Sequence, residues 1–134
     1  TYYDSPLALA AESDFLVVAT PGGADTRHLV HAAVLDALGP QGYLVNIARG
    51  SVVDTDALIA ALAERRIAGA GLDVVEGEPV VPPALFTLDN VVLTPHSAGR
   101  SPEAVSATVA LFLENATAHF GGKPVLTPVP GSQG

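Results

Sequence analysis

Four short apolar runs alternate with stretches of helical character along the chain. The runs are rich in Val, Ile and Leu and have turn residues at their ends, which is typical of buried strands; they cover residues 15–19, 43–48, 67–74 and 91–93. Helical spacing and capping residues predict helices at about 6–12, 31–38, 55–66 and 102–120. This alternation predicts an α/β fold with a parallel sheet and right-handed crossovers.

Two of the predicted strands carry further expectations. The run at 15–19 is apolar without interruption, which predicts a parallel strand covered on both faces. The run at 67–74 contains Gly69 and Gly71, which weaken a strand. These glycines therefore predict the close approach of another backbone or of a ligand. Residues 76–83 contain three prolines and predict a loop before the last strand.

The composition narrows the class of protein. The chain has 134 residues, of which 49% are hydrophobic and 15% charged, so we expect one folded domain with a core. A net charge of −8, with six scattered basic residues, argues against a nucleic-acid partner. No apolar run approaches the roughly 20 residues of a membrane span. The absence of cysteine excludes disulfides and is compatible with a cytoplasmic location.

Polar side chains follow three of the predicted strands at their carboxyl ends. Arg49 follows the second strand, Asp73 ends the third with Glu78 shortly after it, and His96 follows the fourth. Ligands of parallel sheets bind outside the carboxyl ends of the strands, so these residues are expected to converge. Each also has a simpler interpretation: a solvated arginine, an exposed loop carboxylate, a loop histidine, or an aspartate that closes its strand through a turn.

The chemistry of such a group is specific. A guanidinium matches a carboxylate in a bidentate way, and a histidine can give or take one proton near neutral pH. A neighbouring glutamate stabilises the imidazolium form. Together, Arg49, Glu78 and His96 could hold a small 2-oxo acid and protonate its carbonyl as a hydride arrives. No nucleophile accompanies them, and His28 and His31 lack further ligands, so we predict no metal site.

Three blocks of sequence resemble the signature blocks of the D-isomer-specific 2-hydroxyacid dehydrogenases. They are residues 46–54, 69–79 and 89–96, and their order and spacing match those of the family. Residues 36–42 and 118–128 are similar to the glyoxylate, hydroxypyruvate and hydroxyphenylpyruvate reductases within it. The resemblance covers nearly the whole chain.

The resemblance implies a role for each site residue. Arg49 would bind the carboxylate and carbonyl of the substrate, His96 would donate the proton, Glu78 would orient His96, and Asp73 would contact the nicotinamide end of the cofactor. The cofactor, NADPH or NADH, would be lined by Thr20, Pro21, Ile47, Ala48, Arg49, Asp73, His96, Ser97, Ala98 and Gly99.

The resemblance also implies a domain plan. Residues 1–100 would form the second half of a Rossmann-type, doubly wound nucleotide-binding domain, 101–122 a crossover helix, and 123–134 a tail of a largely absent substrate domain. The glycine-rich loop and the residue that selects NADH or NADPH would precede Thr1. The sequence has no Met, even at position 1, as expected of a fragment.

The expected activity is the reduction of glyoxylate or hydroxypyruvate to the D-2-hydroxy acid by a nicotinamide cofactor, in a cytoplasmic homodimer with no nucleic-acid or membrane partner. The alternative is a non-catalytic, NAD(H)-binding regulatory protein of the same fold.

Overall fold

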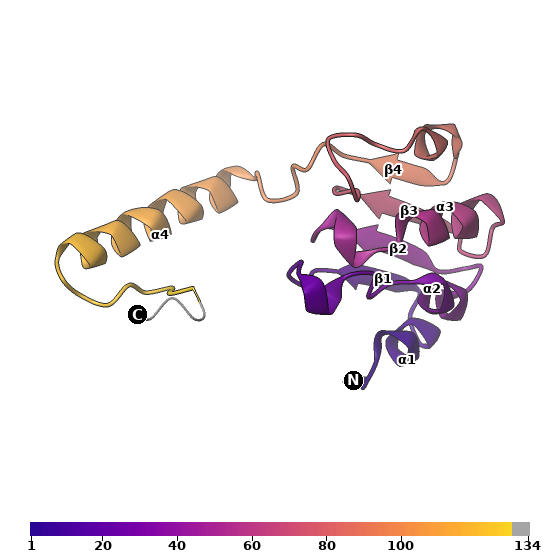
Figure 1. Cartoon of the computed structure of the whole chain (residues 1–134), viewed down its shortest axis with the longest axis horizontal. Helices are drawn as coiled ribbons and strands as arrows, with labels where there is room; N and C mark the ends of the chain where they lie inside the picture. The colour runs from indigo at the N-terminus through magenta and orange to yellow at the C-terminus, as the bar shows by residue number, and fades with distance from the viewer. Residues whose placement is uncertain (130–134) are drawn as a thin grey trace. The chain divides into compact units, whose positions relative to one another are not determined.

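The computed structural model describes residues 1–129, and the chain divides into two compact units, Thr1–Ser97 and Ala98–Gly134. The first unit contains a four-stranded sheet with the order β1-β2-β3-β4 (Figure 1). The second unit contains one long helix and the turn after it. Residues 130–134 of the predicted tail lie outside the described residues.

All three strand pairings are parallel, which confirms the predicted α/β class. The register places one residue of each strand in a row across the sheet. In one such row Leu16 pairs with Leu44, Leu44 with Ala70, and Ala70 with Val91. The third strand is shorter than residues 67–74, although the amides of Ala68 and Asp73 beside it still donate to the carbonyls of Gly42 and Asn46. The strands are β1 Phe15–Val18, β2 Tyr43–Asn46, β3 Gly69–Leu72 and β4 Val91–Leu93.

The helices of the first unit begin where the sequence predicts. Ser5 accepts a hydrogen bond from the amide of Ala8, and Asp54 accepts one from Ala57, so both residues act as N-caps. The helices are α1 Pro6–Ala11, α2 Ala32–Leu38 and α3 Thr55–Ala63.

The end of α3 differs from the prediction. The helix stops at Ala63, because Arg65 adopts a left-handed conformation with φ of 55°. Arg65 and Arg66 therefore lie beyond the helix rather than in its last turn. They form ion pairs instead, Arg65 with Asp89 at 2.6 Å and Arg66 with Asp36.

One face of the sheet is buried beneath the helices. Leu16, Leu44 and Leu72 of the strands share a core with Leu35 of α2 and Leu62 of α3. Burial of this apolar face is the main stabilising term of the unit.

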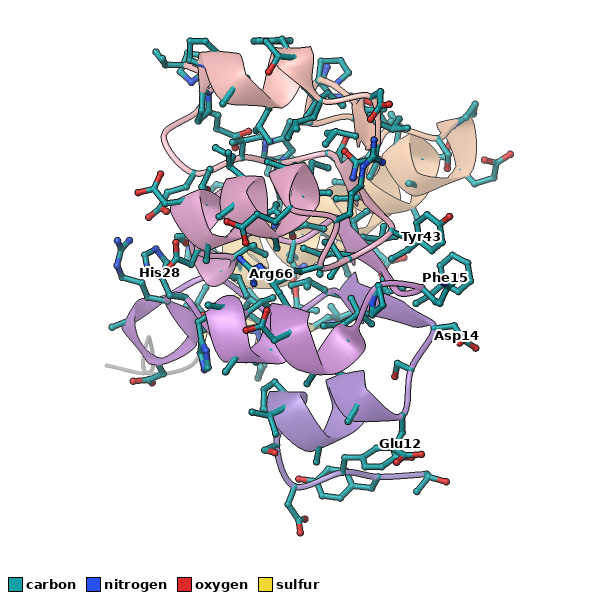
Figure 2. The ribbon with its side chains drawn as sticks, turned by 90° about the vertical axis from the view of Figure 1, so that its right-hand side faces the viewer. Glu12, Asp14, Phe15, His28, Tyr43 and Arg66 are labelled. Carbon is teal, nitrogen blue, oxygen red and sulfur yellow. The ribbon has the colours of Figure 1, made fainter. Side chains whose placement is uncertain are left out.

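The opposite face of the sheet is open in the described residues. Phe15 is 64% exposed and Val17 55%, so the prediction of a strand covered on both faces is wrong for this chain. The rings of Phe15 and Tyr43 stack at 5.3 Å at the amino ends of β1 and β2 (Figure 2). The burial pattern therefore alternates along the strand, although the sequence does not.

The two glycines of β3 behave differently. A Cβ atom at Gly69 would lie 2.8 Å from the carbonyl oxygen of Asn90, which confirms the predicted close approach of another backbone. A Cβ at Gly71 would meet nothing within 4 Å, so no other backbone approaches it in the described residues, and the approach of a ligand there stays a prediction.

Three short 3-10 helices were not predicted, and all lie in the loops of the first unit. They are η1 Ala24–Thr26, η2 Gly50–Val52 and η3 Pro83–Thr87. Each is too short to show a periodic pattern in the sequence.

The second unit is built on α4, Pro102–Phe120. Ser101 caps it by accepting a hydrogen bond from the amide of Ala104. After the helix, Asn115 holds the returning chain, because its Oδ1 accepts from the amides of Leu126 and Thr127. Within residues 1–129, no helix is long and apolar enough to cross a membrane.

Candidate active site

His96 and Glu78 form a hydrogen-bonded pair beyond the carboxyl ends of β4 and β3. Nδ1 of His96 lies 2.8 Å from Oε1 of Glu78, and the two side chains are 50% and 35% exposed. The backbone of His96 is left-handed, with φ of 51°, and its amide donates to the carbonyl oxygens of Asp73 and Thr94. The pair leaves Nε2 as the ring nitrogen that can reach a bound molecule.

Asp73 organises the turn that presents His96. Its side chain is buried, and its Oδ1 accepts hydrogen bonds from the hydroxyl of Thr94 at 2.5 Å and the amide of Ser97 at 2.8 Å. Its own amide donates to the carbonyl of Asn46 in the adjacent strand. Asp73 therefore stabilises the loop that follows β4, in addition to the end of β3.

Arg49 follows β2 in an exposed position, as predicted. Its Nη1 donates to the carbonyl of Ala48 at 2.7 Å, which leaves its other N–H groups for a ligand. The buried side chain of Asn46 fixes the backbone here, because it accepts from the amide of Ala48 and donates to the carbonyl of Arg49. Among the described residues, no hydrogen bond or ion pair joins Arg49 to Glu78 or His96.

Backbone contacts bring neighbouring loops of the site together. A Cβ at Gly50 would lie 2.1 Å from the carbonyl carbon of Val75 and 2.2 Å from the nitrogen of Glu76. A Cβ at Gly22 would lie 2.8 Å from Cγ of Arg49. The loops that follow β1, β2 and β3 are therefore in direct contact, and Arg49 lies within this group.

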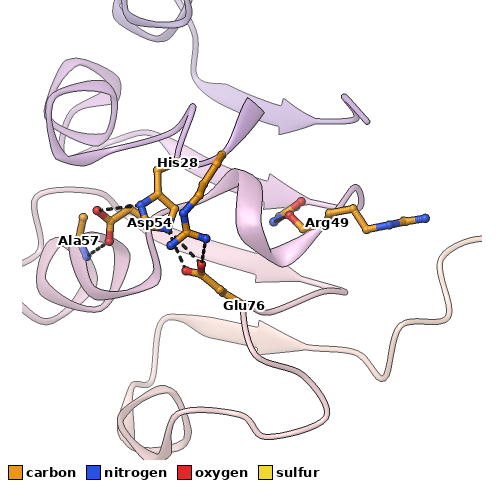
Figure 3. Close-up of polar contacts among 7 residues, drawn as sticks. His28, Arg49, Asp54, Ala57 and Glu76 are labelled. Atoms are coloured by element: carbon orange, nitrogen blue, oxygen red, sulfur yellow. Dashed lines mark hydrogen bonds and ion pairs between the residues drawn. The ribbon is translucent and has the colours of Figure 1, made fainter. Parts of the chain in front are cut away.

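A polar cluster joins the same three loops (Figure 3). Nη1 of Arg27 lies 2.6 Å from Oε1 of Glu76, and Nε2 of His28 lies 3.0 Å from its Oε2. Nδ1 of His28 is 3.8 Å from Oδ2 of Asp54, the N-cap of α3. In Figure 3, the side chain of Arg49 extends away from this cluster.

The charge state of Glu76 reflects these contacts. Partial burial by itself would raise the pKa of Glu76, but hydrogen bonds from His28 and Arg27 outweigh that effect. The net result is a pKa below the usual value of a glutamate. Glu76 is thus held as a carboxylate between two potential cations.

A pocket of about 460 Å³ lies beside His96. Its volume is in the range of small-molecule sites, which usually combine apolar walls with a few polar groups. The polar groups are Asp73, Glu78, Thr94 and His96, and the apolar walls are Val75, Pro79, Val81, Leu93 and Pro95.

The residues predicted to line the cofactor fall into two sets. Thr20 and Pro21 follow β1, Ile47 and Ala48 follow β2, and Ser97 ends the first unit. Ala98 and Gly99 belong to the second unit. The part of all these residues in the cleft stays a prediction. Within residues 1–129, no group of three or more potential ligands could hold a metal ion.

Sequence reasoning missed several residues that shape the site. Asn46 had one signal, a polar residue at the end of an apolar strand. Arg27, His28 and Glu76 had none, because they come from loops far apart in the chain. His28 was considered only as a metal ligand.

Comparison with known proteins agrees with this geometry. Residues 1–98 match the NAD-binding domain of the D-isomer specific 2-hydroxyacid dehydrogenases. The chain is 52% identical over 129 residues to the hydroxyphenylpyruvate reductase of Plectranthus scutellarioides, covering 96% of this chain and 41% of that protein. It is also 52% identical over 128 residues to glyoxylate/hydroxypyruvate reductase A of Arabidopsis thaliana, covering 96% and 41%.

A solved structure supports the same relationship. The NADPH-dependent glyoxylate/hydroxypyruvate reductase of Sinorhizobium meliloti, in complex with NADP and malonate, is 47% identical with a TM-score of 0.90, and the match covers 97% of this chain and 41% of that one. The chain thus spans less than half the length of these relatives. It belongs to the D-isomer-specific 2-hydroxyacid dehydrogenase family.

Proposed function

We propose that the protein containing this chain reduces a small 2-oxo acid, such as glyoxylate or hydroxypyruvate, to the D-2-hydroxy acid with NADPH or NADH. The observation that carries the proposal is the His96–Glu78 pair, at 2.8 Å, on the same sheet edge as the exposed Arg49. The names of the similar reductases support the substrate class, and the NADP in the Sinorhizobium meliloti relative supports NADPH.

Arg49 binds the substrate in this proposal. Its guanidinium presents a planar fork of N–H donors, which suits the carboxylate of a 2-oxo acid. Asn46 fixes the backbone on both sides of the Ala48–Arg49 peptide, so the start of the side chain is well positioned. The exposed position lets the guanidinium reach a ligand above the sheet edge.

His96 supplies the proton. Nε2 of the imidazolium donates to the carbonyl oxygen as the carbonyl carbon is reduced, and the oxygen becomes the hydroxyl of the product. Glu78 accepts a hydrogen bond from Nδ1, which holds the ring in place. The remaining neutral histidine takes a new proton from solvent through its exposed ring.

The residues present fit a nicotinamide cofactor. The pocket beside His96 has apolar walls and a turn held by Asp73, and Pro21 and Ile47, which follow β1 and β2, are exposed at the sheet edge where such cofactors bind. When bound, the cofactor supplies the hydride. The residues proposed to line it are Thr20, Pro21, Ile47, Ala48, Arg49, Asp73, His96, Ser97, Ala98 and Gly99.

The domain plan is proposed on the same basis. Residues 1–100 are assigned to the nucleotide-binding domain, 101–122 to a crossover helix and 123–134 to the substrate domain. The family match to residues 1–98 supports the first assignment. A cytoplasmic homodimer is carried over from the family resemblance.

The direct test is turnover by the full-length protein. Oxidation of NADPH should follow the addition of glyoxylate or hydroxypyruvate, and the product should be the D-isomer where it is chiral. Binding of NADPH without turnover of any 2-oxo acid would favour the non-catalytic, regulatory alternative.

A further inference from the structure

We propose that Arg27 and His28 hold Glu76 as an anchor for the loop that presents Glu78, and that these three are positioning residues for the Glu78–His96 pair. This inference rests on the proposed function for its kinetic consequences. The contacts themselves lie within the first unit and involve none of the residues assigned to substrate or cofactor.

The anchor has two donors on one carboxylate. Arg27 approaches Oε1 of Glu76 at 2.6 Å, and Nε2 of His28 lies 3.2 Å from Oε1 and 3.0 Å from Oε2. The side chains of His28 and Glu76 are 32% and 28% exposed, so solvent screens them less than a surface pair. The lowered pKa of Glu76 agrees with a carboxylate held in its charged form.

His28 is itself held in an unusual conformation. Its φ is 50°, a left-handed value that is unfavourable for a non-glycine residue. Its amide donates to the carbonyl of Ser51 at 2.8 Å, and Val30 bridges Val53 in parallel. The segment after β1 therefore runs along the segment after Arg49, and this pairing fixes the backbone that carries the His28 side chain.

Glu76 transmits this constraint to Glu78 through a short length of chain. The amide of Glu78 donates to the carbonyl of Val75 at 3.3 Å, so the backbone turns tightly between them. On the other side, Gly50 packs directly against the peptide that joins Val75 to Glu76. Fixing Glu76 thus fixes both the start of the Glu78 loop and its contact with the loop of Arg49.

The geometry sets a clear kinetic expectation. Loss of the anchor would let Glu78 move relative to His96, and a misplacement of about 1 Å can cost on the order of 100-fold in rate. In the full-length protein, Glu76→Gln should lower kcat by about 10- to 100-fold and change KM for the 2-oxo acid much less.

A double-variant cycle separates positioning from a general loss of structure. If Glu76 acts through Glu78, adding Glu76→Gln to Glu78→Gln should cause no further loss of kcat. A loss that multiplies in the double variant would overturn the inference, as would a kcat for Glu76→Gln equal to that of the wild type. If Glu76→Gln does not fold, Arg27→Gln is used with the same criteria.

Asp89→Asn is the matched control. It breaks another arginine–carboxylate ion pair, that of Arg65 at 2.6 Å, and Asp89 lies beyond η3 and shortly before β4. Its kcat should equal that of the wild type. A loss as large as that of Glu76→Gln would show a general effect of removing surface charge and would contradict the inference.

A second readout does not depend on activity. If the wild type turns over no 2-oxo acid, the proposed function fails, and the anchor is then judged by NMR. Glu76→Gln should shift the ring-nitrogen signals of His96 and speed hydrogen exchange at the amide of Glu78, while His119 in the second unit stays unchanged. Unchanged signals at both positions would overturn the anchor.

Discussion

The proposed proton donor is held by groups from outside its own strand. The left-handed backbone of His96 carries a cost of roughly 1–2 kcal/mol. Hydrogen bonds from its amide to Asp73 and Thr94, and from its ring to Glu78, offset that cost. Backbone strain of this kind is common at functional sites, where surrounding contacts maintain a conformation that is unfavourable for the residue by itself.

Arg49 provides the first prediction at this scale. Arg49→Lys should raise KM for the 2-oxo acid by about 10- to 100-fold, because an ammonium cannot replace the two parallel hydrogen bonds of a guanidinium. Steady-state kinetics on the full-length protein measure this change. An unchanged KM for the 2-oxo acid would remove Arg49 from the substrate site.

The sequence indicated some of these residues and not others, for a physical reason. Arg49, Glu78 and His96 follow strand ends, and a parallel sheet gathers such positions at one edge. The pairing of His28 with Glu76 depends on how two distant loops fold against each other. A local pattern of apolar and polar residues cannot predict a contact between distant loops, so the contact of His28 with Glu76 is seen only in the structure.

At the scale of elements, the loops after β2 and β3 pack backbone against backbone. Gly50→Ala should destabilise the chain by about 1–3 kcal/mol, as expected of overpacking, since its Cβ would lie 2.1 Å from the carbonyl carbon of Val75. Urea unfolding followed by circular dichroism measures the change.

Gly71→Ala is the matched control for this substitution. It adds the same methyl group to a strand where nothing lies within 4 Å. Its free energy of unfolding should be close to that of the wild type. Equal losses for the two variants would contradict the close packing of the site loops.

The Glu76 cluster predicts a pH dependence of stability. Its carboxyl has a pKa below the ordinary value of 4.5, so it stabilises the fold above that value and loses the effect as the pH falls through the lowered pKa. Glu76→Gln should therefore be less stable than the wild type at pH 7, and the difference should shrink below about pH 4. Urea unfolding at a series of pH values measures it, and a constant difference would contradict the cluster.

Element boundaries show where sequence patterns stop being informative. The apolar run at 67–74 is longer than β3, because Ile67 and Val74 are buried beyond the two ends of the strand. Apolar residues indicate which positions are buried, and the buried positions extend beyond the ends of the strand. The helix caps were predicted well, because a capping side chain bonds to an amide only three residues away.

At the scale of the whole molecule, the alternation of strands and helices was enough to predict a parallel sheet. It could not predict which face of the sheet is covered. Phe15 and Val17 are as apolar as Leu16 and Val18, yet they are exposed in the described residues. Apolar side chains on both sides of β1 predict two covered faces, and this chain covers one.

The family of this chain is established by similarity, whereas its activity is not. Residues 1–98 match the family's NAD-binding domain, but the chain spans only 41% of the length of its relatives. The activity therefore belongs to the proposal for the full-length protein. Its central claim is that His96 donates the proton during reduction.

The most direct test is the kcat of a full-length His96→Gln variant for NADPH-dependent reduction of hydroxypyruvate. The account predicts a loss on the order of 10²–10⁴, the usual contribution of general acid catalysis. The upward shift of Tm on adding NADPH should persist, since the variant keeps its fold and its cofactor cleft. A kcat close to that of the wild type would contradict the account.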